Sequence, residues 1–146
     1  MLEMVSGQPG TMLDVGSGKG YWVRKAVEAG YRVTACDLTN TLRDVECEFV
    51  QGDIGNLPFE DGQFDVVTCS HTLEHIVELD RAIAELKRVA RKQLIIVVPC
   101  QRYNYLTPDG HVNFFPFREK LLFHLGEPGA DCRKLGGDWL ARIRFD

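Results

Sequence analysis

The segment Met12–Gly20, with the sequence MLDVGSGKG, constrains the fold of this chain more than any other segment. A short apolar run that contains Asp14 indicates a buried strand, and Gly16, Gly18 and Gly20 follow it at every second position. Glycine allows left-handed backbone dihedrals and lets a ligand approach the main-chain amides closely. A strand that runs directly into such a loop predicts a sharp turn at the ligand-binding edge of a sheet.

The spacing of these glycines argues against a dinucleotide-binding fingerprint. That fingerprint is G-x-G-x-x-G, and its third glycine would fall at the position of Tyr21. The loop instead has the pattern G-x-G-x-G, with Asp14 two residues before its first glycine. A tight turn that binds nothing could use the same residues, so the loop alone leaves both interpretations open.

Two further acidic residues follow predicted strands. Tyr31–Cys36 contains β-branched residues and leads into Asp37, and Glu48–Gln51 is a third short strand with Asp53 shortly after it. Parallel strands place their carboxyl ends at one edge of a sheet, where a carboxylate can accept hydrogen bonds from both hydroxyls of a ribose. An isolated acid usually serves as a loop or cap residue. Three acids after three successive strands favour a shared site.

Helix and strand patterns alternate along the chain, which predicts an α/β fold with a doubly wound, mostly parallel sheet in three layers. Gly136 and Gly137 separate two short extended segments within Ala130–Asp146, and this predicts a closing antiparallel hairpin. With 146 residues the chain has room for one domain, residues 1–146. The other expected elements are helices over Lys19–Ala29, Leu79–Arg91 and Pro116–Leu125 and strands over Phe64–Cys69 and Leu94–Val98.

Composition excludes several classes of protein. A net charge of −4 disfavours a strongly basic surface for nucleic acid. Residues 1–10 lack the pattern of a secretion signal, and no apolar run reaches the roughly 18 residues of a membrane span, so we expect a cytoplasmic protein. The five cysteines form no C-x-x-C pair and are expected to be reduced.

Together these motifs resemble those of the class I S-adenosylmethionine (SAM) dependent methyltransferases, of the type 11 kind. The loop Gly16–Gly20 is similar to their motif I, and Leu57–Ile76 is similar to the segment around the fourth strand in small-molecule and lipid methyltransferases. The resemblance implies a seven-stranded Rossmann-like sheet and SAM as the cofactor. It also implies transfer of a methyl group to a small-molecule or lipid-like acceptor.

The same resemblance implies which residues bind the cofactor. The glycine loop would accommodate the methionine part, and Asp14 would orient its amino acid end. Asp37 would bind the ribose, Asp53 would meet the adenine amino group, and Ile54 would pack on the ring. The full set is Asp14, Gly16, Ser17, Gly18, Gly20, Asp37, Leu38, Asp53, Ile54 and Ser70.

Methyl transfer is an in-line displacement, so the enzyme mainly holds the nucleophile and the methyl group close, aligned and dry. A general base helps only when the nucleophile must lose a proton. His71, directly after the fourth strand, and His111 are the candidate catalytic bases. His75, Tyr103 and Tyr105 are candidates for the substrate pocket, and for His75 a packing or supporting role is favoured over catalysis.

We expect no metal site. His71 and His75 are four residues apart and could share a helical face, and this pair together with Glu74 suggests metal ligands. The sequence HTLEH, however, differs from the H-E-x-x-H order of zinc sites. No third ligand is evident from the sequence. The end of the fourth strand also lacks the N/D-P-P-Y/F/W motif of amino-directed nucleic-acid methyltransferases, which disfavours a nucleic-acid acceptor.

Two features depart from the family pattern. Only eleven residues, Leu38–Glu48, separate Asp37 from Phe49, fewer than a parallel crossover normally takes, so this connection is expected to be irregular. Barely ten residues precede Met12, whereas members of the family often have helices there that cover the cofactor. We therefore expect either that Gln101–Phe115 closes over the site as a lid or that a second copy or a partner subunit covers it.

Two other functions remain open. A SAM-binding, non-catalytic or partner-dependent subunit would carry the same motifs, and the shortened crossover and N-terminus favour it. An NAD-linked oxidoreductase would use Asp37 on a ribose equally well. Its expected glycine spacing is absent, however, and the chain has no second domain to hold a substrate.

Overall fold

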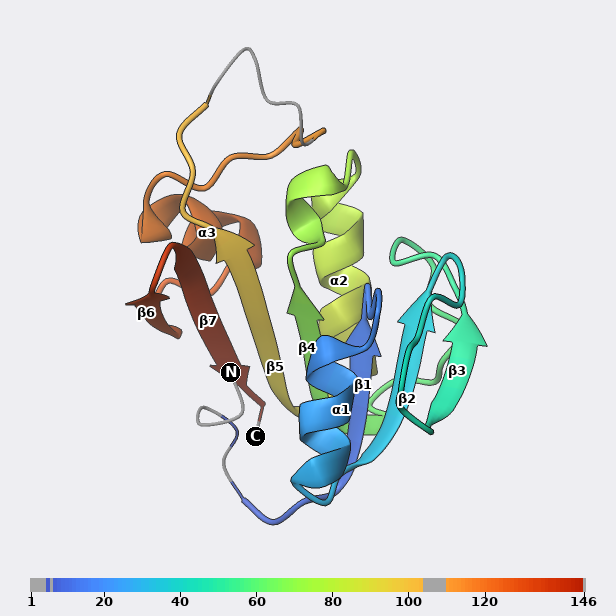
Figure 1. Cartoon of the computed structure of the whole chain (residues 1–146). Helices are drawn as coiled ribbons and strands as arrows, with labels where there is room; N and C mark the ends of the chain where they lie inside the picture. Colours follow the sequence, from blue (N-terminus) through green and yellow to red (C-terminus); the bar gives the residue numbers. More distant parts are fainter. Residues whose placement is uncertain (1–4, 6, 104–109, 146) are drawn as a thin grey trace.

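The structure, a computed structural model, describes residues 5, 7–103 and 110–145. Its strands are β1 Thr11–Val15, β2 Arg32–Asp37, β3 Glu48–Gln51, β4 Phe64–Ser70, β5 Ala90–Pro99, β6 Asp131–Leu135 and β7 Asp138–Arg144. They form one sheet in the order β3-β2-β1-β4-β5-β7-β6 (Figure 1). Strands β1 to β5 pair in parallel, and β7 lies antiparallel between β5 and β6. The predicted doubly wound, seven-stranded sheet with a closing hairpin is confirmed.

Helices cover both faces of the sheet, which gives the expected three layers. In Figure 1, α1 (Tyr21–Glu28) lies in front of the sheet and α2 (Leu79–Val89) lies behind it. α1 buries Val23 and Ala26 against apolar side chains on one face of the sheet. α2 and α3 (Arg118–Leu125) belong to the larger core on the opposite face.

The helices are shorter than the sequence predicted, and the backbone explains why. α1 begins at Tyr21 because Gly20, directly before it, takes a left-handed conformation with φ 82°. α2 ends two residues early because Ala90 is already extended and starts β5. α3 begins two residues later than predicted, after an extended residue. The connection over residues 38–47 contains no helix or strand, which agrees with the irregular crossover expected there.

The register of the sheet brings three strand ends to one level. Val15 at the end of β1 pairs with Cys36 of β2 and Cys69 of β4. From β3 at one edge the chain returns to β4 on the other side of β1, so the strand order reverses at β1. In doubly wound sheets, ligands bind in the crevice outside the carboxyl ends of the strands at this reversal. A short 3-10 helix, η2 (Leu73–His75), follows β4 at the same edge.

Candidate cofactor site and its neighbouring histidines

The three motif glycines all have left-handed backbones, with φ of 72° at Gly16, 50° at Gly18 and 82° at Gly20. Two of them also lack room for a side chain. A Cβ on Gly16 would overlap Thr72, and a Cβ on Gly20 would crowd Leu42. A Cβ on Gly18 would meet no atom of the described residues within 4 Å. Packing of the chain itself therefore requires two of the glycines, whereas Gly18 faces open space.

Asp37, at the end of β2, joins the second strand to the glycine loop. Its Oδ2 accepts a hydrogen bond from the Gly18 amide at 2.8 Å, and its Oδ1 accepts one from the Leu38 amide at 2.7 Å. Each carboxylate oxygen has a second acceptor site. Asp37 thus holds the loop in place and still has acceptor capacity for the hydroxyls of a ligand.

A pocket lies where the loops after β1, β2, β3 and β4 meet. It encloses about 100 Å³, less than the roughly 300–1,000 Å³ of a complete ligand pocket, so a nucleoside-sized occupant would extend into open space. Its lining contains five of the ten cofactor residues that the resemblance implied. The lining residues are Val15, Gly16, Cys36, Asp37, Leu38, Gly52, Asp53, Ile54, Thr72 and Ile76.

Sequence reasoning missed Thr72 and Ile76, which close the pocket from the β4 side. Both flank η2, and the only signal for them was their place after a buried strand. Asp53 is exposed, and its Oδ1 already accepts a hydrogen bond from the Gly55 amide at 2.8 Å, as in an ordinary turn. Ile54 beside it is buried. The adenine contacts expected of these two residues stay a prediction.

Asp14 is not part of the pocket lining. Its carboxyl is buried, and its Oδ1 accepts a hydrogen bond of 2.6 Å from the Thr68 hydroxyl. Burial raises the pKa of Asp14 to about 7, and the charge of Asp37 adds to this rise, although the Thr68 hydrogen bond lowers the pKa. The carboxyl is therefore partly protonated at neutral pH. Its predicted contact with the amino acid end of the cofactor stays a prediction.

The two serines of the predicted set differ in their partners. Ser17 is buried in the glycine loop, and its hydroxyl has no hydrogen-bond partner among the residues that the structure describes. Ser70, at the end of β4, accepts a hydrogen bond from Trp22 Nε1 at 3.1 Å. A buried hydroxyl without a partner is costly. The Ser17 hydroxyl therefore marks a point in the loop where a ligand atom would be stabilising.

His71 lies just past β4 in a left-handed conformation, with φ 51°. Its Nε2 is 3.1 Å from Asp138 Oδ2, and its Nδ1 is 3.5 Å from Glu74 Oε1. The hydrogen bond to Glu74 raises the pKa of His71, and the charge of Asp138 also raises it, whereas burial lowers it. The expected helical face shared by His71 and His75 is wrong, because η2 starts only at Leu73 and the turned backbone at His71 lies before it.

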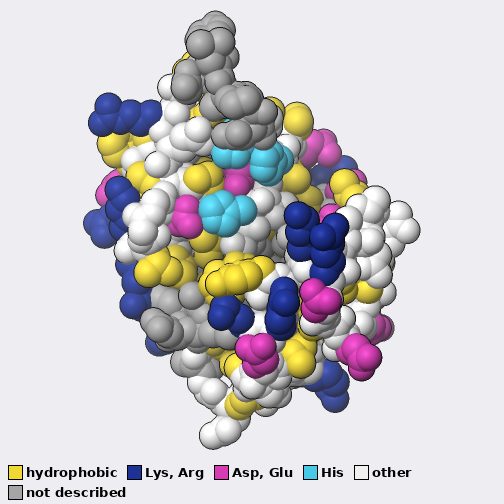
Figure 2. Space-filling view, in the orientation of Figure 1, with side chains coloured by type: hydrophobic (Ala, Val, Ile, Leu, Met, Phe, Trp, Pro, Cys, Tyr) yellow, Lys and Arg dark blue, Asp and Glu magenta, His cyan; other side chains and the backbone are white. Residues whose placement is uncertain are grey.

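His75 and His111 lie together although they are far apart in the sequence. Their ring centroids are 4.7 Å apart, at an angle of 74° between the ring planes. Figure 2 shows histidine side chains gathered beside acidic ones over the carboxyl ends of β4 and β5. The structure therefore supplies the third ligand-type residue near Glu74 and His75 that the sequence did not reveal.

The segment expected to act as a lid lies only partly within the described residues. Tyr105 and the rest of 104–109 lie outside them. Tyr103 is 65% exposed, and its ring is 5.1 Å from that of Phe114. Phe114 and Phe115 are buried, and Phe115 belongs to the core of the domain. Phe114 and Phe115 thus anchor the end of this segment in the interior. Closure of Gln101–Phe115 over the site stays a prediction.

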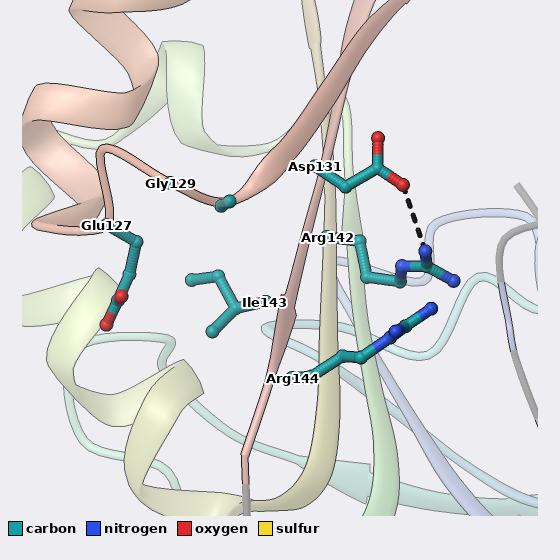
Figure 3. Close-up of a pocket in the computed structure, with 7 residues that line it drawn as sticks. Glu127, Gly129, Asp131, Arg142, Ile143 and Arg144 are labelled. Atoms are coloured by element: carbon teal, nitrogen blue, oxygen red, sulfur yellow. Dashed lines mark hydrogen bonds and ion pairs between the residues drawn. The ribbon is translucent and has the colours of Figure 1, made fainter.

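A second cavity lies between the loop after α3 and the C-terminal hairpin, and it contains none of the predicted site residues. Figure 3 shows Arg142 and Arg144 of β7 extending to the same side and Glu127 lying apart from them. Arg142 Nη2 is 2.9 Å from Asp131 Oδ2 across the hairpin. The charge of Arg142 at this cavity is thus already paired within the chain.

The comparison with protein families agrees with this geometry. The sequence profile of the family described as Methyltransferase domain (Methyltransf_11) matches residues 13–98, from β1 to near the end of β5. The chain belongs to this family. Its members are class I SAM-dependent methyltransferases, and the cofactor of the family is SAM.

Two curated methyltransferases show the degree of similarity. The chain is 36% identical over 104 residues to malonyl-[acyl-carrier protein] O-methyltransferase from Serratia marcescens, which covers 66% of this chain and 41% of that protein. It is 32% identical over 125 residues to demethylmenaquinone methyltransferase from Renibacterium salmoninarum, which covers 81% of this chain and 49% of that protein. The chain thus spans less than half the length of these two relatives.

The same fold occurs in solved methyltransferase structures. The SAM-dependent methyltransferase from Mesorhizobium loti superposes with a TM-score of 0.74 over 99% of this chain and 95% of that one, at 15% identity. This likeness shows the fold. No helix in the described part of this methyltransferase domain has the length and apolar character needed to cross a membrane.

The residues of this domain fit the cofactor of the family. Gly18 leaves open space over the loop, the Ser17 hydroxyl lacks a partner among the described residues, and Asp37 has free acceptor capacity. The pocket is lined by the carboxylate of Asp37 and by apolar side chains, Ile54 among them. These are the groups that a ribose and a flat heterocycle require.

Proposed function

We propose that this chain is a SAM-dependent methyltransferase that acts on a small-molecule or lipid-like acceptor. Membership of the methyltransferase domain family supports the reaction. The names of the two relatives, a demethylmenaquinone methyltransferase and a malonyl-[acyl-carrier protein] O-methyltransferase, support an acceptor of this kind.

The observation that carries the proposal is the pocket at the strand reversal, where the lining residue Asp37 also accepts a hydrogen bond from the Gly18 amide. In this proposal Asp37 binds the ribose hydroxyls, and Asp53 and Ile54 hold the adenine. Gly16–Gly20, Ser17 among them, lie against the methionine part. When bound, SAM supplies a methyl group activated on a sulfonium.

The chain's own residues orient the acceptor and remove its proton where it has one. His71 is the first candidate base, because it lies at the carboxyl end of β4 and is half exposed. His111 is the second, and in this proposal His75 and Tyr103 contact the acceptor. Most of the rate of methyl transfer comes from holding the nucleophile in line with the methyl group. Removal of a proton from the nucleophile increases this rate further.

The main alternative is a SAM-binding subunit that needs a second copy or a partner to cover the site. The small enclosed volume of the pocket and the exposed Tyr103 favour it, since neither excludes water from the reacting groups. An NAD-linked oxidoreductase is the weaker alternative. Asp37 would serve it, but the glycine spacing would not.

Calorimetric titration with SAM and with NAD tests the cofactor. We expect one SAM to bind per chain and NAD not to bind, and binding of NAD in place of SAM would overturn the proposal. Incubation with methyl-labelled SAM and a panel of quinols and carboxylic acids held as thioesters then tests the reaction. Transfer to a panel member supports the enzyme. Tight SAM binding without transfer, together with a monomer by light scattering, favours the partner-dependent alternative.

A further inference from the structure

Glu74 has a buried carboxyl group, and its two oxygens differ in their contacts. Its side chain is 1% exposed, in η2 at the carboxyl end of β4. Oε1 lies 3.5 Å from His71 Nδ1, but Oε2 has no hydrogen-bond partner among the residues that the structure describes. Leaving a buried acceptor without a partner costs stability. A positive group next to Oε2 would remove this cost.

Two imidazoles lie within reach of that carboxylate. Glu74, His75 and His111 each offer a ligand atom, and these atoms lie within 4.8 Å of one another. Atoms bound to one zinc ion at about 2.0–2.1 Å lie about 3.3 Å apart in a tetrahedral site. The side chains would therefore close in by about an ångström or more. His75 is exposed and His111 is half-buried, so both have room to move.

Both imidazoles are already held in the form that a metal ion needs. Nδ1 of His75 is 3.4 Å from the Gly110 carbonyl oxygen, and Nδ1 of His111 is 2.6 Å from Gln101 Oε1. Carbonyl and amide oxygens only accept hydrogen bonds, so the neutral tautomer that makes these contacts carries its ring proton on Nδ1. The lone pair is then on Nε2. Metal-binding histidines are oriented in this way by a partner on the other ring nitrogen.

Asn113 connects the segment that carries His111 to the segment that carries Glu74 and His75. Its Nδ2 donates hydrogen bonds to the Leu73 carbonyl at 2.9 Å and to the Ile76 carbonyl at 2.6 Å. The amides of Val112 and Asn113 both donate to the Glu74 carbonyl, at 2.8 and 3.0 Å. These hydrogen bonds hold residues 111–113 against η2, and His111 therefore lies next to Glu74.

We propose that Glu74, His75 and His111 bind one divalent transition-metal ion of the zinc class. The ligand set of two imidazoles and a carboxylate favours such an ion over magnesium or calcium, which prefer oxygen ligands. Three protein ligands leave a coordination position open, as in catalytic zinc sites. His111 is then a metal ligand, and His71 stays the candidate base.

The ion would lie beside the cofactor pocket, because Thr72 and Ile76, which flank the ligands of η2 in the chain, both line that pocket. An ion held there would leave its open position for an oxygen of the methyl acceptor, and this role rests on the function proposed above. The binding of the ion itself does not depend on that function.

The test is a titration of the chelator-treated chain, without an affinity tag, with Co²⁺ followed by Zn²⁺. We expect one Co²⁺ per chain with visible absorption bands, and displacement by one Zn²⁺. His75→Ala and His111→Ala should each weaken Zn²⁺ binding about 100-fold or more. Gln101→Ala, which removes only the partner of His111, should weaken it about 10–100-fold. Circular dichroism confirms that each variant is folded.

His124→Ala is the matched control, because this fourth histidine lies in α3 with its Nδ1 3.4 Å from Asp80 and outside the cluster. It should bind the metal ions as the unmodified chain does. Absence of one-to-one binding would overturn the proposal, as would binding that survives in His75→Ala and His111→Ala. A parallel titration with SAM separates the two proposals. If the unmodified chain does not bind SAM, only the proposed methyltransferase function is contradicted.

Discussion

The two halves of the carboxyl edge of the sheet are built in different ways. In the cofactor half, β1, β2 and β3 each end in a loop, and the key groups lie at the last strand residue or in the first residues after it: Gly16–Gly20, Asp37 and Asp53. In the histidine half, Glu74 and His75 follow β4, but His111 comes from a segment beyond β5 and is held by Asn113. The first half is encoded locally, and the second depends on contacts between distant segments. Substitutions should therefore affect the two halves separately.

The largest expected effect is at Gly18. A valine there would project into the open space over the loop and would strain a backbone with φ 50°. We expect Gly18→Val to abolish SAM binding in calorimetry while the chain stays folded by circular dichroism.

Gly126→Val is the control for this prediction. Gly126, at the end of α3, has φ 65° and likewise no atom within 4 Å of an added Cβ, so the backbone cost is similar, about 1–2 kcal/mol. It should bind SAM normally. If Gly18→Val also binds SAM normally, the loop is only a structural turn.

The second effect concerns the pH dependence of stability. The pKa of Asp14 is about 7 in the folded chain and 3.8 ordinarily, so the folded state retains a proton that the unfolded state releases between these values. The protonated carboxyl of Asp14 contributes its whole stabilisation to the free energy of unfolding below about pH 4. This stabilisation decreases by about 1.4 kcal/mol per pH unit as the pH rises to about 7. The total loss in the free energy of unfolding is on the order of 4 kcal/mol.

Urea unfolding of the chain and of Asp14→Asn at pH 5 and pH 7.5 measures this contribution. The asparagine cannot ionise, and its amide oxygen can still accept the hydrogen bond from Thr68. The unmodified chain should lose more stability than the variant between the two pH values. Parallel losses would show that Asp14 ionises normally in the folded chain.

A smaller effect is expected at Asp37. Asp37→Ala removes the acceptor for the Gly18 amide and the proposed acceptor for the ribose, so SAM binding should weaken by about 1.5–3 kcal/mol. Calorimetry measures the change. Zn²⁺ binding by the histidine half should stay unchanged. An unaltered SAM affinity would remove Asp37 from the cofactor site.

The smallest effect, and the sharpest test of the separation, is at Asn113. Asn113→Ala loses two hydrogen bonds to η2, which should lower the free energy of unfolding by about 1–2 kcal/mol. It should also weaken Zn²⁺ binding, because His111 is no longer held beside Glu74. SAM affinity should stay within about twofold. Equal losses of both ligands would show that the two halves are coupled.

Much of the fold and the cofactor half could be predicted from the sequence, because the signals are local. Alternating strand and helix patterns predicted the sheet and its closing hairpin. The glycine loop and the acids at the ends of β1, β2 and β3 predicted where the pocket lies, and five of the predicted residues line it. Strand ends in a parallel sheet share one edge, so residues at those ends meet whatever lies between them.

Only the tertiary structure decided the rest. Asp14 fits the motif in the sequence, but burial and the Thr68 hydrogen bond, rather than the motif, set its protonation. Phe114 and Phe115 could have belonged to a lid, and packing places them in the interior. His111 reaches Glu74 only through hydrogen bonds between the segment after β5 and η2. Contacts between residues far apart in the chain leave no periodic pattern or fixed spacing in the sequence. Only the packing of the fold brings such residues together.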